Sequence, residues 1–196
     1  MPTDRRLHRI RDVVRRRQRD LTLVLEDIHD PHNAEAVLRT CDVFGVQHVH
    51  LVFASEAPFN PRKLGKSTSS SANKWLDFTL HTSVRACLLD LRADGFELVA
   101  TVADIAADSL SHTDLSADRL ALLFGNERDG LSHEALRLAD RRVTIPSAGM
   151  VQSLNLSVAA AVCLYEVTRQ RGRDPDRYAL DAAERARLEQ DLLRRA

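Results

Sequence analysis

The 196-residue sequence predicts an α/β fold in which helices cover both faces of a mostly parallel sheet. Segments typical of strands alternate along the chain with segments typical of helices, and this order favours a parallel sheet. The strand segments are continuous apolar runs, as expected for strands that are buried on both faces. Ligands of such sheets bind beyond the carboxyl ends of the strands. We therefore expect a site in the segments that follow residues 26, 102, 125 and 145.

The elements that support this fold can be placed in order along the chain. Gly45 and Gly95 stand where two helices should end, and Asp181 and Glu184 have capping-box spacing at the start of the last helix. Residues 54–74 show no clear period and carry basic side chains, so we expect a mobile basic loop. The expected helices comprise residues 5–18, 34–44, 84–93, 132–139, 153–170 and 181–194. The expected strands comprise residues 21–27, 46–53, 75–79, 96–103, 119–125 and 141–146.

The net charge is zero, from 28 basic and 28 acidic side chains, but the charges are unevenly distributed. Residues 1–20 hold eight arginines against three aspartates and predict a basic helical arm, while residues 171–196 predict a helical tail. Arginine-rich segments suit contacts with phosphate groups. An amphipathic helix that buries Leu7, Ile10 and Val14 would explain the arm equally well, and both interpretations can hold together.

Several classes of protein are excluded by composition. No apolar run approaches the roughly 20 residues that cross a bilayer. Charges also stand where a signal peptide would be apolar, so we expect a cytoplasmic protein that does not bind membranes. Cys41, Cys87 and Cys163 lie far apart and lack the paired spacing of metal ligands. We therefore expect buried, reduced thiols and no metal.

Three segments at the expected carboxyl edge carry polar residues that plain turns do not need. In the first, residues 30–40, Asn33 stands at a helix start and Arg39 lies further along the same helix. Asn33 can cap the helix or face a ligand. A helical ion pair between Arg39 and Glu35 is the simpler explanation for this arginine.

The second segment, FGNERDGLS at residues 124–132, is bounded by glycines that allow a ligand to approach the backbone closely. Glu127 is the acid at its centre. The segment lacks the phosphate-binding motifs of P-loop and dinucleotide folds. An ordinary solvated turn is the alternative interpretation.

The third segment spans residues 145–161, in which Ser153 and Asn155 are expected in the first turn of a helix. Free N–H groups and the positive end of the helix dipole favour a carboxylate or another anion there. The helix at 153–170 is apolar on two faces, so it needs a second burial partner from its own chain or from another subunit. The residues alone thus predict a ligand-binding α/β enzyme with a basic arm.

These segments carry a resemblance to a known family. NAEAVLRTCDVFGV, LLFGNERDGLS and IPSAGMVQSLNLSVAAAVCLYE resemble the three signature motifs of the SpoU branch of the SPOUT methyltransferases. The arm RRRQRDLTLVLEDIHDPHN and the tail YEVTRQR resemble the TrmH-type tRNA (guanosine-2′-O)-methyltransferases, so nearly the whole chain is covered. The third motif is long and specific, whereas the second departs from the family pattern at Asn126, Arg128 and Asp129.

The resemblance implies a SPOUT catalytic domain over residues 21–170, with a deep trefoil knot at about 120–165 that forms the pocket for S-adenosylmethionine. It also implies a homodimer with the active site at the subunit interface, and a reaction without a metal. The implied cofactor contacts are Thr101, Gly125, Asn126, Ile145 and Leu154.

The implied reaction transfers a methyl group from S-adenosylmethionine to the ribose 2′-hydroxyl of a guanosine in tRNA, with the D-loop guanosine at position 18 as the expected target. A guanidinium is a poor base because it stays charged, so we expect Arg39 to stabilise the forming alkoxide and to hold a neighbouring phosphate. The implied catalytic residues are Arg39, Asn33, Glu127, Ser153 and Asn155. The expected RNA contacts of the arm and tail are Arg9, Arg16, Arg17, Arg19, Arg169 and Arg171.

Three alternatives remain at this point. A ribosomal RNA 2′-O-methyltransferase of the same family is one, but the compact arm and tail favour tRNA. A catalytically silent RNA-binding module is another, and the presence of Asn33, Arg39, Ser153 and Asn155 favours an enzyme. The third is a nucleotide-dependent enzyme of Rossmann type, which the missing phosphate motifs disfavour.

Overall fold

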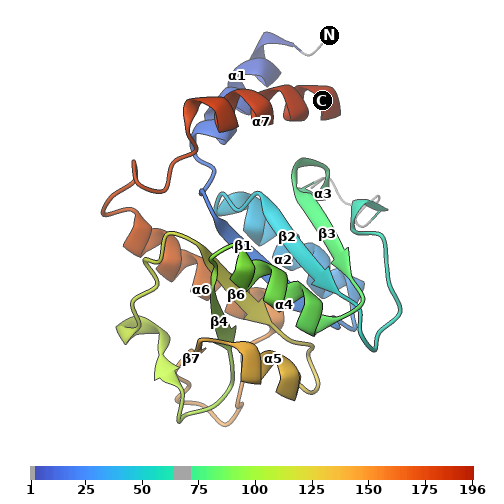
Figure 1. Cartoon of the computed structure of the whole chain (residues 1–196), viewed down its shortest axis with the longest axis vertical. Coiled ribbons are helices and arrows are strands. Elements are labelled where there is room, and N and C mark those ends of the chain that lie inside the picture. Colours follow the sequence, from blue (N-terminus) through green and yellow to red (C-terminus); the bar gives the residue numbers. More distant parts are fainter. Residues whose placement is uncertain (1–2, 64–71) are drawn as a thin grey trace.

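The computed structural model describes residues 3–63 and 72–196. Its centre is a sheet with the strand order β3-β2-β1-β6-β4-β7-β5, in which every neighbouring pair is parallel (Figure 1). The prediction of a mostly parallel sheet is therefore confirmed. The strands are β1 (Leu21–Glu26), β2 (His48–Val52), β3 (Asp77–His81), β4 (Glu97–Thr101), β5 (Asp108–Ser109), β6 (Leu120–Phe124) and β7 (Arg141–Thr144).

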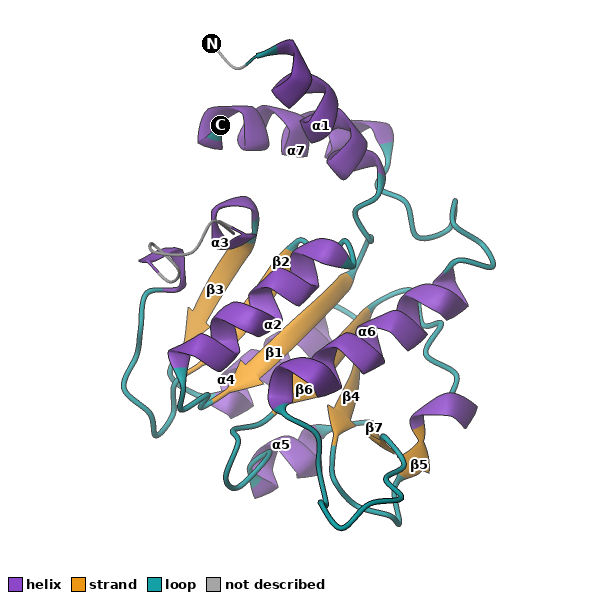
Figure 2. Cartoon of the chain, turned by 180° about the vertical axis from the view of Figure 1, so that it is seen from behind, coloured by secondary structure: helices purple, strands orange, loops and turns teal. Residues whose placement is uncertain are grey.

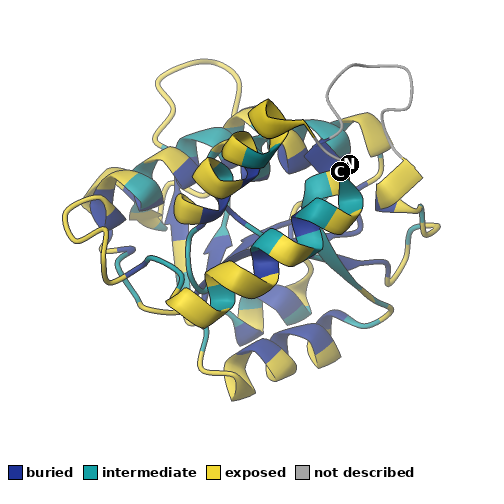
Figure 3. Cartoon of the chain, turned by 90° about the horizontal axis from the view of Figure 1, so that it is seen from above, coloured by how far each residue is buried: buried dark blue, intermediate teal, exposed yellow. Residues whose placement is uncertain are grey.

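Helices cover both faces of the sheet, as predicted. Figure 2 shows α2 (Pro31–Val43) and α6 (Leu156–Arg171) on one face, while α4 (Val84–Ala93) and α5 (His133–Leu138) lie behind the sheet. Successive residues of β1 pack against opposite helix layers. Leu23 packs with α2 and α6, whereas Val24 packs with α4 and α5. Figure 3 shows the buried strands at the centre, surrounded by helices that are exposed on their outer sides. The knot implied for residues 120–165 stays a prediction.

Three buried thiols belong to these two layers. Cys41 lies in α2 and Cys163 in α6, and both belong to one core layer, whereas Cys87 lies in α4 on the opposite face of the sheet. All three cysteines are free, as predicted. Burial raises the pKa of Cys87 and of Cys163 to about 12, since a thiolate is poorly solvated in an apolar core.

Two helices near the carboxyl edge begin at other positions than the sequence predicted. α2 begins earlier, because the Asp30 side chain caps it and a proline fits the first helical position. α6 begins later, because the Asn155 side chain accepts the backbone N–H of Ser157 and so caps the helix. Ser153 therefore lies in the loop before α6 and not in its first turn.

Several short elements are absent from the prediction. Trp75 ends the helix α3 (Ala72–Trp75) instead of starting a strand, and β5 has only two residues. Within the expected basic loop, η1 (Pro61–Lys63) is a single 3₁₀ turn, and residues 64–71, which include Lys66, lie outside the described residues. A second 3₁₀ turn, η2 (Leu110–His112), follows β5.

The arm and the tail pack against each other to form one helical pair, which projects from the body in Figure 1. α1 (Asp4–Arg15) and α7 (Ala182–Arg195) share a small apolar cluster, and the capping box of Asp181 and Glu184 is present. The buried members of the cluster are Ile10, Val14, Leu188 and Leu192. The amphipathic interpretation of the arm is therefore confirmed, although Leu7 is only partly buried.

Two arginines that were predicted to bind RNA lie in the interior instead. Arg171 is 1% exposed and donates to the carbonyl oxygens of Arg19 and Ala117, at 2.8 and 2.9 Å. Its guanidinium also lies over the Tyr178 ring, 4.4 Å from the centroid. Desolvation lowers the pKa of Arg171 to about 10. These contacts join the end of α6 to the segment that leads from the arm into β1.

Arg17 is buried in a similar way. It is 1% exposed and forms a 2.7 Å ion pair with the carboxylate of Asp42. It also donates to the backbone carbonyl of Val46, at 3.2 Å. Neither Arg17 nor Arg171 presents its guanidinium to solvent, so an RNA contact by either residue would require it to leave its buried partners, and these two contacts stay predictions.

Replacement of Arg171 by methionine should lower the free energy of unfolding by at least about 2 kcal/mol. The substitution leaves two carbonyl groups without their donor, and each unsatisfied buried group costs about 1–3 kcal/mol. Arg173→Met is the matched control, because Arg173 is exposed two residues away and surface changes stay within about 0.5 kcal/mol. Chemical denaturation of both variants measures the difference, and equal losses would contradict a structural role for Arg171.

Candidate active site

The parallel sheet places four of the sequence-predicted segments at one edge. β1, β6, β4 and β7 are consecutive in the sheet, and their carboxyl ends are followed by the segments that begin at residues 27, 125, 102 and 145. In a parallel sheet these ends lie on the same side. Residues that are far apart in the sequence can therefore meet beyond this edge.

Three of the five predicted catalytic residues do meet there. The Asn33 Nδ2 donates to Glu127 Oε1 at 2.6 Å, and the Asn155 Nδ2 approaches Asn33 Oδ1 at 3.4 Å. The other Glu127 oxygen accepts the backbone N–H of His29 at 3.2 Å. This group is called the Asn33–Glu127–Asn155 cluster below. It joins the segments that follow β1, β6 and β7.

Two helix starts converge on this cluster. Asn33 lies in the first turn of α2, and Asn155 is the N-cap of α6. The Asn155 Oδ1 accepts the N–H and the hydroxyl of Ser157, at 2.9 and 2.7 Å, which leaves its Nδ2 directed at Asn33. The amino ends of helices carry partial positive charge, so a carboxylate such as that of Glu127 is stabilised between them.

A closed loop presents Glu127 to the cluster. The backbones of Asn126 and Gly130 exchange hydrogen bonds of 3.2 and 3.1 Å. The Asn126 Oδ1 accepts the backbone N–H groups of Arg128 and Asp129, at 2.9 and 2.7 Å. This side-chain oxygen therefore shapes the loop, and the cofactor contact that the sequence predicted for Asn126 stays a prediction.

Sequence reasoning missed a second set of contacts around His29. Its Nδ1 lies 3.0 Å from Glu56 Oε1, and its Nε2 lies 2.9 Å from an Arg128 nitrogen. Because arginine only donates, Nε2 accepts and Nδ1 carries the hydrogen that is donated to Glu56. The position of His29 directly after β1 was the only signal in the sequence that could have suggested it.

Arg39 and Ser153 are placed differently from the other predicted catalytic residues. Arg39 is exposed nearly two turns along α2 from Asn33, and Ser153 is exposed in the loop before α6. Within residues 3–63 and 72–196, neither side chain makes a hydrogen bond or an ion pair. The helical pair of Arg39 with Glu35 that the sequence offered as an alternative is therefore not formed.

The predicted cofactor residues lie at or beyond the carboxyl ends of three adjacent strands, β6, β4 and β7. The Thr101 hydroxyl donates to the carbonyl of Leu123 at 2.8 Å and joins β4 to β6. Ile145 packs partly buried against the core, whereas Leu154 is half-exposed in the loop that also exposes Met150. Apolar side chains beside loop backbone at one sheet edge suit a ligand that combines an aromatic ring system with polar groups.

The exposed arginines of the arm and tail lie elsewhere. Arg9 and Arg16 line a cavity of about 390 Å³ between α1 and the end of α2. α1 leads into the amino end of β1, so this cavity lies at the edge opposite the Asn33–Glu127–Asn155 cluster. Arg19 pairs with Asp181 and Glu184 at 3.6 and 3.4 Å.

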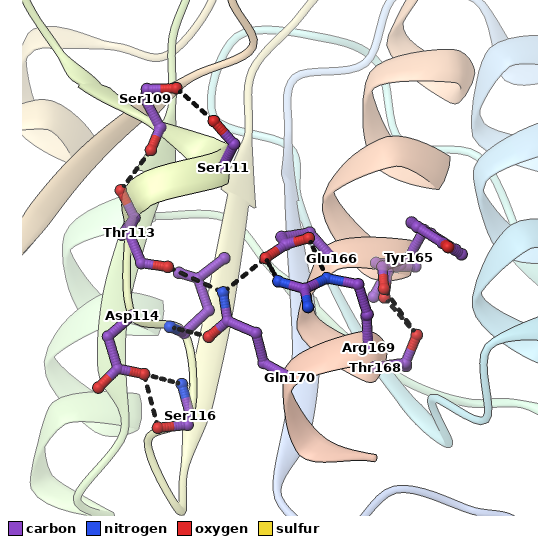
Figure 4. A network of polar contacts seen from close by, with 12 residues as sticks. Ser109, Ser111, Thr113, Asp114, Ser116, Tyr165, Glu166, Thr168, Arg169 and Gln170 are labelled. Atoms are coloured by element: carbon purple, nitrogen blue, oxygen red, sulfur yellow. Dashed lines mark hydrogen bonds and ion pairs between the residues drawn. The ribbon is translucent and has the colours of Figure 1, made fainter. Parts of the chain in front are cut away.

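Arg169 takes part in the polar network of Figure 4. Its guanidinium holds both oxygens of Glu166, at 2.8 and 2.7 Å, and lowers the pKa of that carboxyl. Glu166 also accepts a hydrogen bond from Gln170, which in turn binds the backbone of Thr113 and Leu115. Arg169 is exposed, so it remains accessible to RNA while it supports this network.

The family model described as the SpoU rRNA Methylase family matches residues 20–165. This match includes the whole sheet and all three segments at its carboxyl edge. The chain belongs to the SpoU family.

Relatives within the SpoU family cover most of the chain. A tRNA (guanosine(18)-2′-O)-methyltransferase of Thermus thermophilus is 44% identical, over 86% of this chain and 84% of the relative. The Escherichia coli enzyme of the same description is 38% identical, over 85% and 70%. A 23S rRNA (guanosine-2′-O-)-methyltransferase of Haemophilus influenzae is 31% identical, over 82% and 64%.

Solved structures of SpoU proteins agree with the fold. A TrmH/SpoU tRNA modifying enzyme of A. aeolicus superimposes with a TM-score of 0.84 at 31% identity, and the match covers 97% of this chain and 96% of that one. The SpoU methyltransferase AviRb of Streptomyces viridochromogenes, in complex with AdoMet, gives 0.65 at 29% identity, over 82% and 61%. No helix among the described residues has the length and apolarity needed to span a membrane.

Gly125→Ala should destabilise the loop that presents Glu127. An added Cβ would lie 2.0 Å from the carbonyl carbon of Gly130 and 2.2 Å from the nitrogen of Leu131, and both are backbone atoms. We expect a loss of about 1–3 kcal/mol, typical of overpacking. Gly149→Ala is the control, because the nearest atom to its added Cβ is 3.9 Å away. Thermal unfolding measures the melting temperature of both variants. An unchanged value for Gly125→Ala would refute the close approach of the Gly125 and Gly130 backbones.

Proposed function

We propose that this chain transfers the methyl group of S-adenosylmethionine to the ribose 2′-hydroxyl of the guanosine at position 18 of tRNA. The observation that carries this proposal is the Asn33–Glu127–Asn155 cluster, which joins all three family segments at the carboxyl edge of the sheet. The T. thermophilus and E. coli relatives with the corresponding activity are 44% and 38% identical to this chain over the aligned regions. The ribosomal RNA relative is more distant, which favours tRNA over the ribosomal alternative.

The cluster provides a rigid frame for the ribose. Glu127 fixes the Asn33 amide group, and Asn155 supports it from the start of α6. S-Adenosylmethionine supplies a methyl group on a positively charged sulfur. We place it beside Thr101, Gly125, Ile145 and Leu154, which lie at or beyond the carboxyl ends of adjacent strands. Asn33 would then orient the 2′-hydroxyl toward this position, so that the attack proceeds in line.

The role that we assign to Arg39 is electrostatic. Attack by the 2′-hydroxyl develops negative charge on its oxygen, and a nearby guanidinium stabilises that charge without accepting a proton. The hydroxyl proton would pass to a phosphate oxygen or to solvent. Because Arg39 is exposed and has no partner among the described residues, its guanidinium is available to the RNA. Ser153, in the loop before α6, would line the same site.

A second copy of the chain would complete this site. Arg9 and Arg16 lie at the sheet edge opposite the cluster, so one chain does not bring its own arm to its own site. α6 exposes Val158 and Tyr165, and the preceding loop exposes Met150 and Val151. Exposed apolar side chains in contiguous segments are typical of subunit interfaces. We propose a homodimer through α6, with the arm arginines Arg9, Arg16 and Arg19 and the tail arginine Arg169 on the tRNA.

Methyl transfer to defined transcripts tests the activity directly. The purified protein, given S-adenosylmethionine with a labelled methyl group, should add one methyl group to a tRNA transcript at guanosine 18. A transcript with 2′-deoxyguanosine at this position should accept none, because the acceptor oxygen is missing. Mass mapping of nuclease fragments locates the product. Transfer to the deoxy transcript, or no transfer to either, would refute the proposed function.

Arg39→Ala should lower the turnover rate about a hundred- to a thousandfold, equivalent to about 2.7–4 kcal/mol. If the charge that Arg39 stabilises develops only in the transition state, the affinities for tRNA and cofactor should change little. Single-turnover rates and equilibrium binding separate the two effects.

Arg39→Lys and Glu35→Gln refine this experiment. Lysine keeps the charge but loses the planar fork, so partial rescue indicates simple electrostatics and no rescue indicates bidentate positioning. Glu35→Gln is the control for charge changes elsewhere on α2. A near-normal single-turnover rate for Arg39→Ala would remove Arg39 from the mechanism.

A further inference from the structure

Two histidines and a cysteine gather on the face of the sheet opposite α2 and α6. His50 lies in the middle of β2, His81 ends the edge strand β3, and Cys87 lies in α4. The His50 Nδ1 is 3.0 Å from the His81 Nε2. A nitrogen of each histidine and the Cys87 sulfur all lie within 4.8 Å of one another.

We propose that His50, His81 and Cys87 form a binding site for one zinc-class divalent ion. Imidazole nitrogen and thiolate sulfur are the ligands that zinc prefers, at about 2.0–2.1 and 2.3 Å. Around a tetrahedral ion these bond lengths place neighbouring ligand atoms roughly 3.4–3.6 Å apart. To reach this geometry the two histidine nitrogens, now 3.0 Å apart, would separate slightly, and the ligand atoms, all within 4.8 Å of one another, would close around the ion.

Two of the three groups are already in the state that binds a metal, whereas the Cys87 thiol must lose its proton. Metal ligands must be neutral imidazole and deprotonated thiol. Desolvation, with further contributions from His48 and His81, lowers the pKa of His50 to about 3, and desolvation also lowers the pKa of His81. Both rings are thus neutral near pH 7. The Cys87 thiol, with its raised pKa, would release one proton to solvent when the ion binds.

Neighbouring groups hold the site in place and leave room for a fourth ligand. The His48 ring stacks on His50 with centroids 4.6 Å apart, and its Nε2 lies 2.8 Å from the Thr79 hydroxyl. Asp90, one turn after Cys87, is exposed and acts electrostatically on both His81 and Cys87. Because His50 and His81 are only partly buried, water can take the fourth position.

The proposed ion would have a structural role. β3 is an edge strand of the sheet, and among the described residues its partner strand is β2 alone. An ion held by β2, β3 and α4 would tie this edge strand to the layer above it. The site is built from elements other than those of the Asn33–Glu127–Asn155 cluster, so the inference does not depend on the proposed methyl transfer.

Metal titration of the full chain tests the site. After treatment with a chelator, the protein should bind one Zn²⁺ per chain in calorimetry and release one proton, visible as buffer-dependent enthalpy. Co²⁺ in place of Zn²⁺ should give a thiolate-to-cobalt charge-transfer band in the near ultraviolet. The ion should also raise the melting temperature, because it binds only the folded chain.

Matched variants assign the ligands. Cys87→Ala should abolish the charge-transfer band, and His50→Gln should weaken binding at least about tenfold. Cys41→Ala removes another buried thiol on the opposite face, and His112→Gln removes an exposed histidine, so both controls should bind as the unmodified chain does.

If Cys87→Ala fails to fold, Co²⁺ spectra of His50→Gln and His81→Gln still report on the site through the remaining thiolate. Absence of Zn²⁺ binding by the unmodified chain, or equal affinity in all variants, would overturn the proposal. The three residues would then form only a neutral hydrogen-bonded cluster.

Discussion

The parallel pairing of β1 with β6 is the constraint on which the rest of the structure depends. In-register pairs run from Leu21 with Leu120 to Leu25 with Phe124, so both strands end at the same level. The residue after β6 is Gly125, whose loop touches the start of α2 through Glu127 and Asn33. β7 then brings Asn155 to the same place from the third segment. A change in strand register would separate all three side chains at once.

The two ends of the sheet have different tasks. The carboxyl edge holds a preformed set of amides and a carboxylate between two helix starts, which costs little reorganisation when a ligand binds. The opposite edge carries the arm, whose exposed arginines suit long-range attraction of a polyanion. The interior arginines, Arg17 and Arg171, lie at this same edge and bind the backbone carbonyls of segments that lead into the strands. Arginine residues thus have two roles. The exposed ones suit attraction of a polyanion, and the buried ones bind backbone carbonyls.

The sequence predicted the sheet, its covering helices and the edge that carries the site, because apolar periodicity reports directly on burial. It also placed Asn33, Glu127 and Asn155 at one edge, although their contacts depend on strand order, which no local pattern encodes. The predicted start of α6 was wrong, because an asparagine such as Asn155 can cap a helix as well as lie in its first turn.

Two other features could not have been predicted from local patterns. The burial of Arg17 and Arg171 was not predicted, because the arginines of the arm and tail do not show in the sequence which of them point inward. The contact between His50, His81 and Cys87 is likewise invisible in the sequence, since parallel pairing of β2 with β3 and the packing of α4 bring these residues together.

The shared cluster of α1 and α7 makes the two termini of the chain interdependent. Leu188 and Leu192 are covered by Ile10 and Val14, so removal of either helix exposes the apolar stripe of the other. An exchange of the arm between relatives therefore requires the matching tail, even though the two segments lie at opposite ends of the sequence. Substitutions in one helix limit those that the other tolerates. In evolution, the two ends are expected to vary as a single module, separately from the sheet that they accompany.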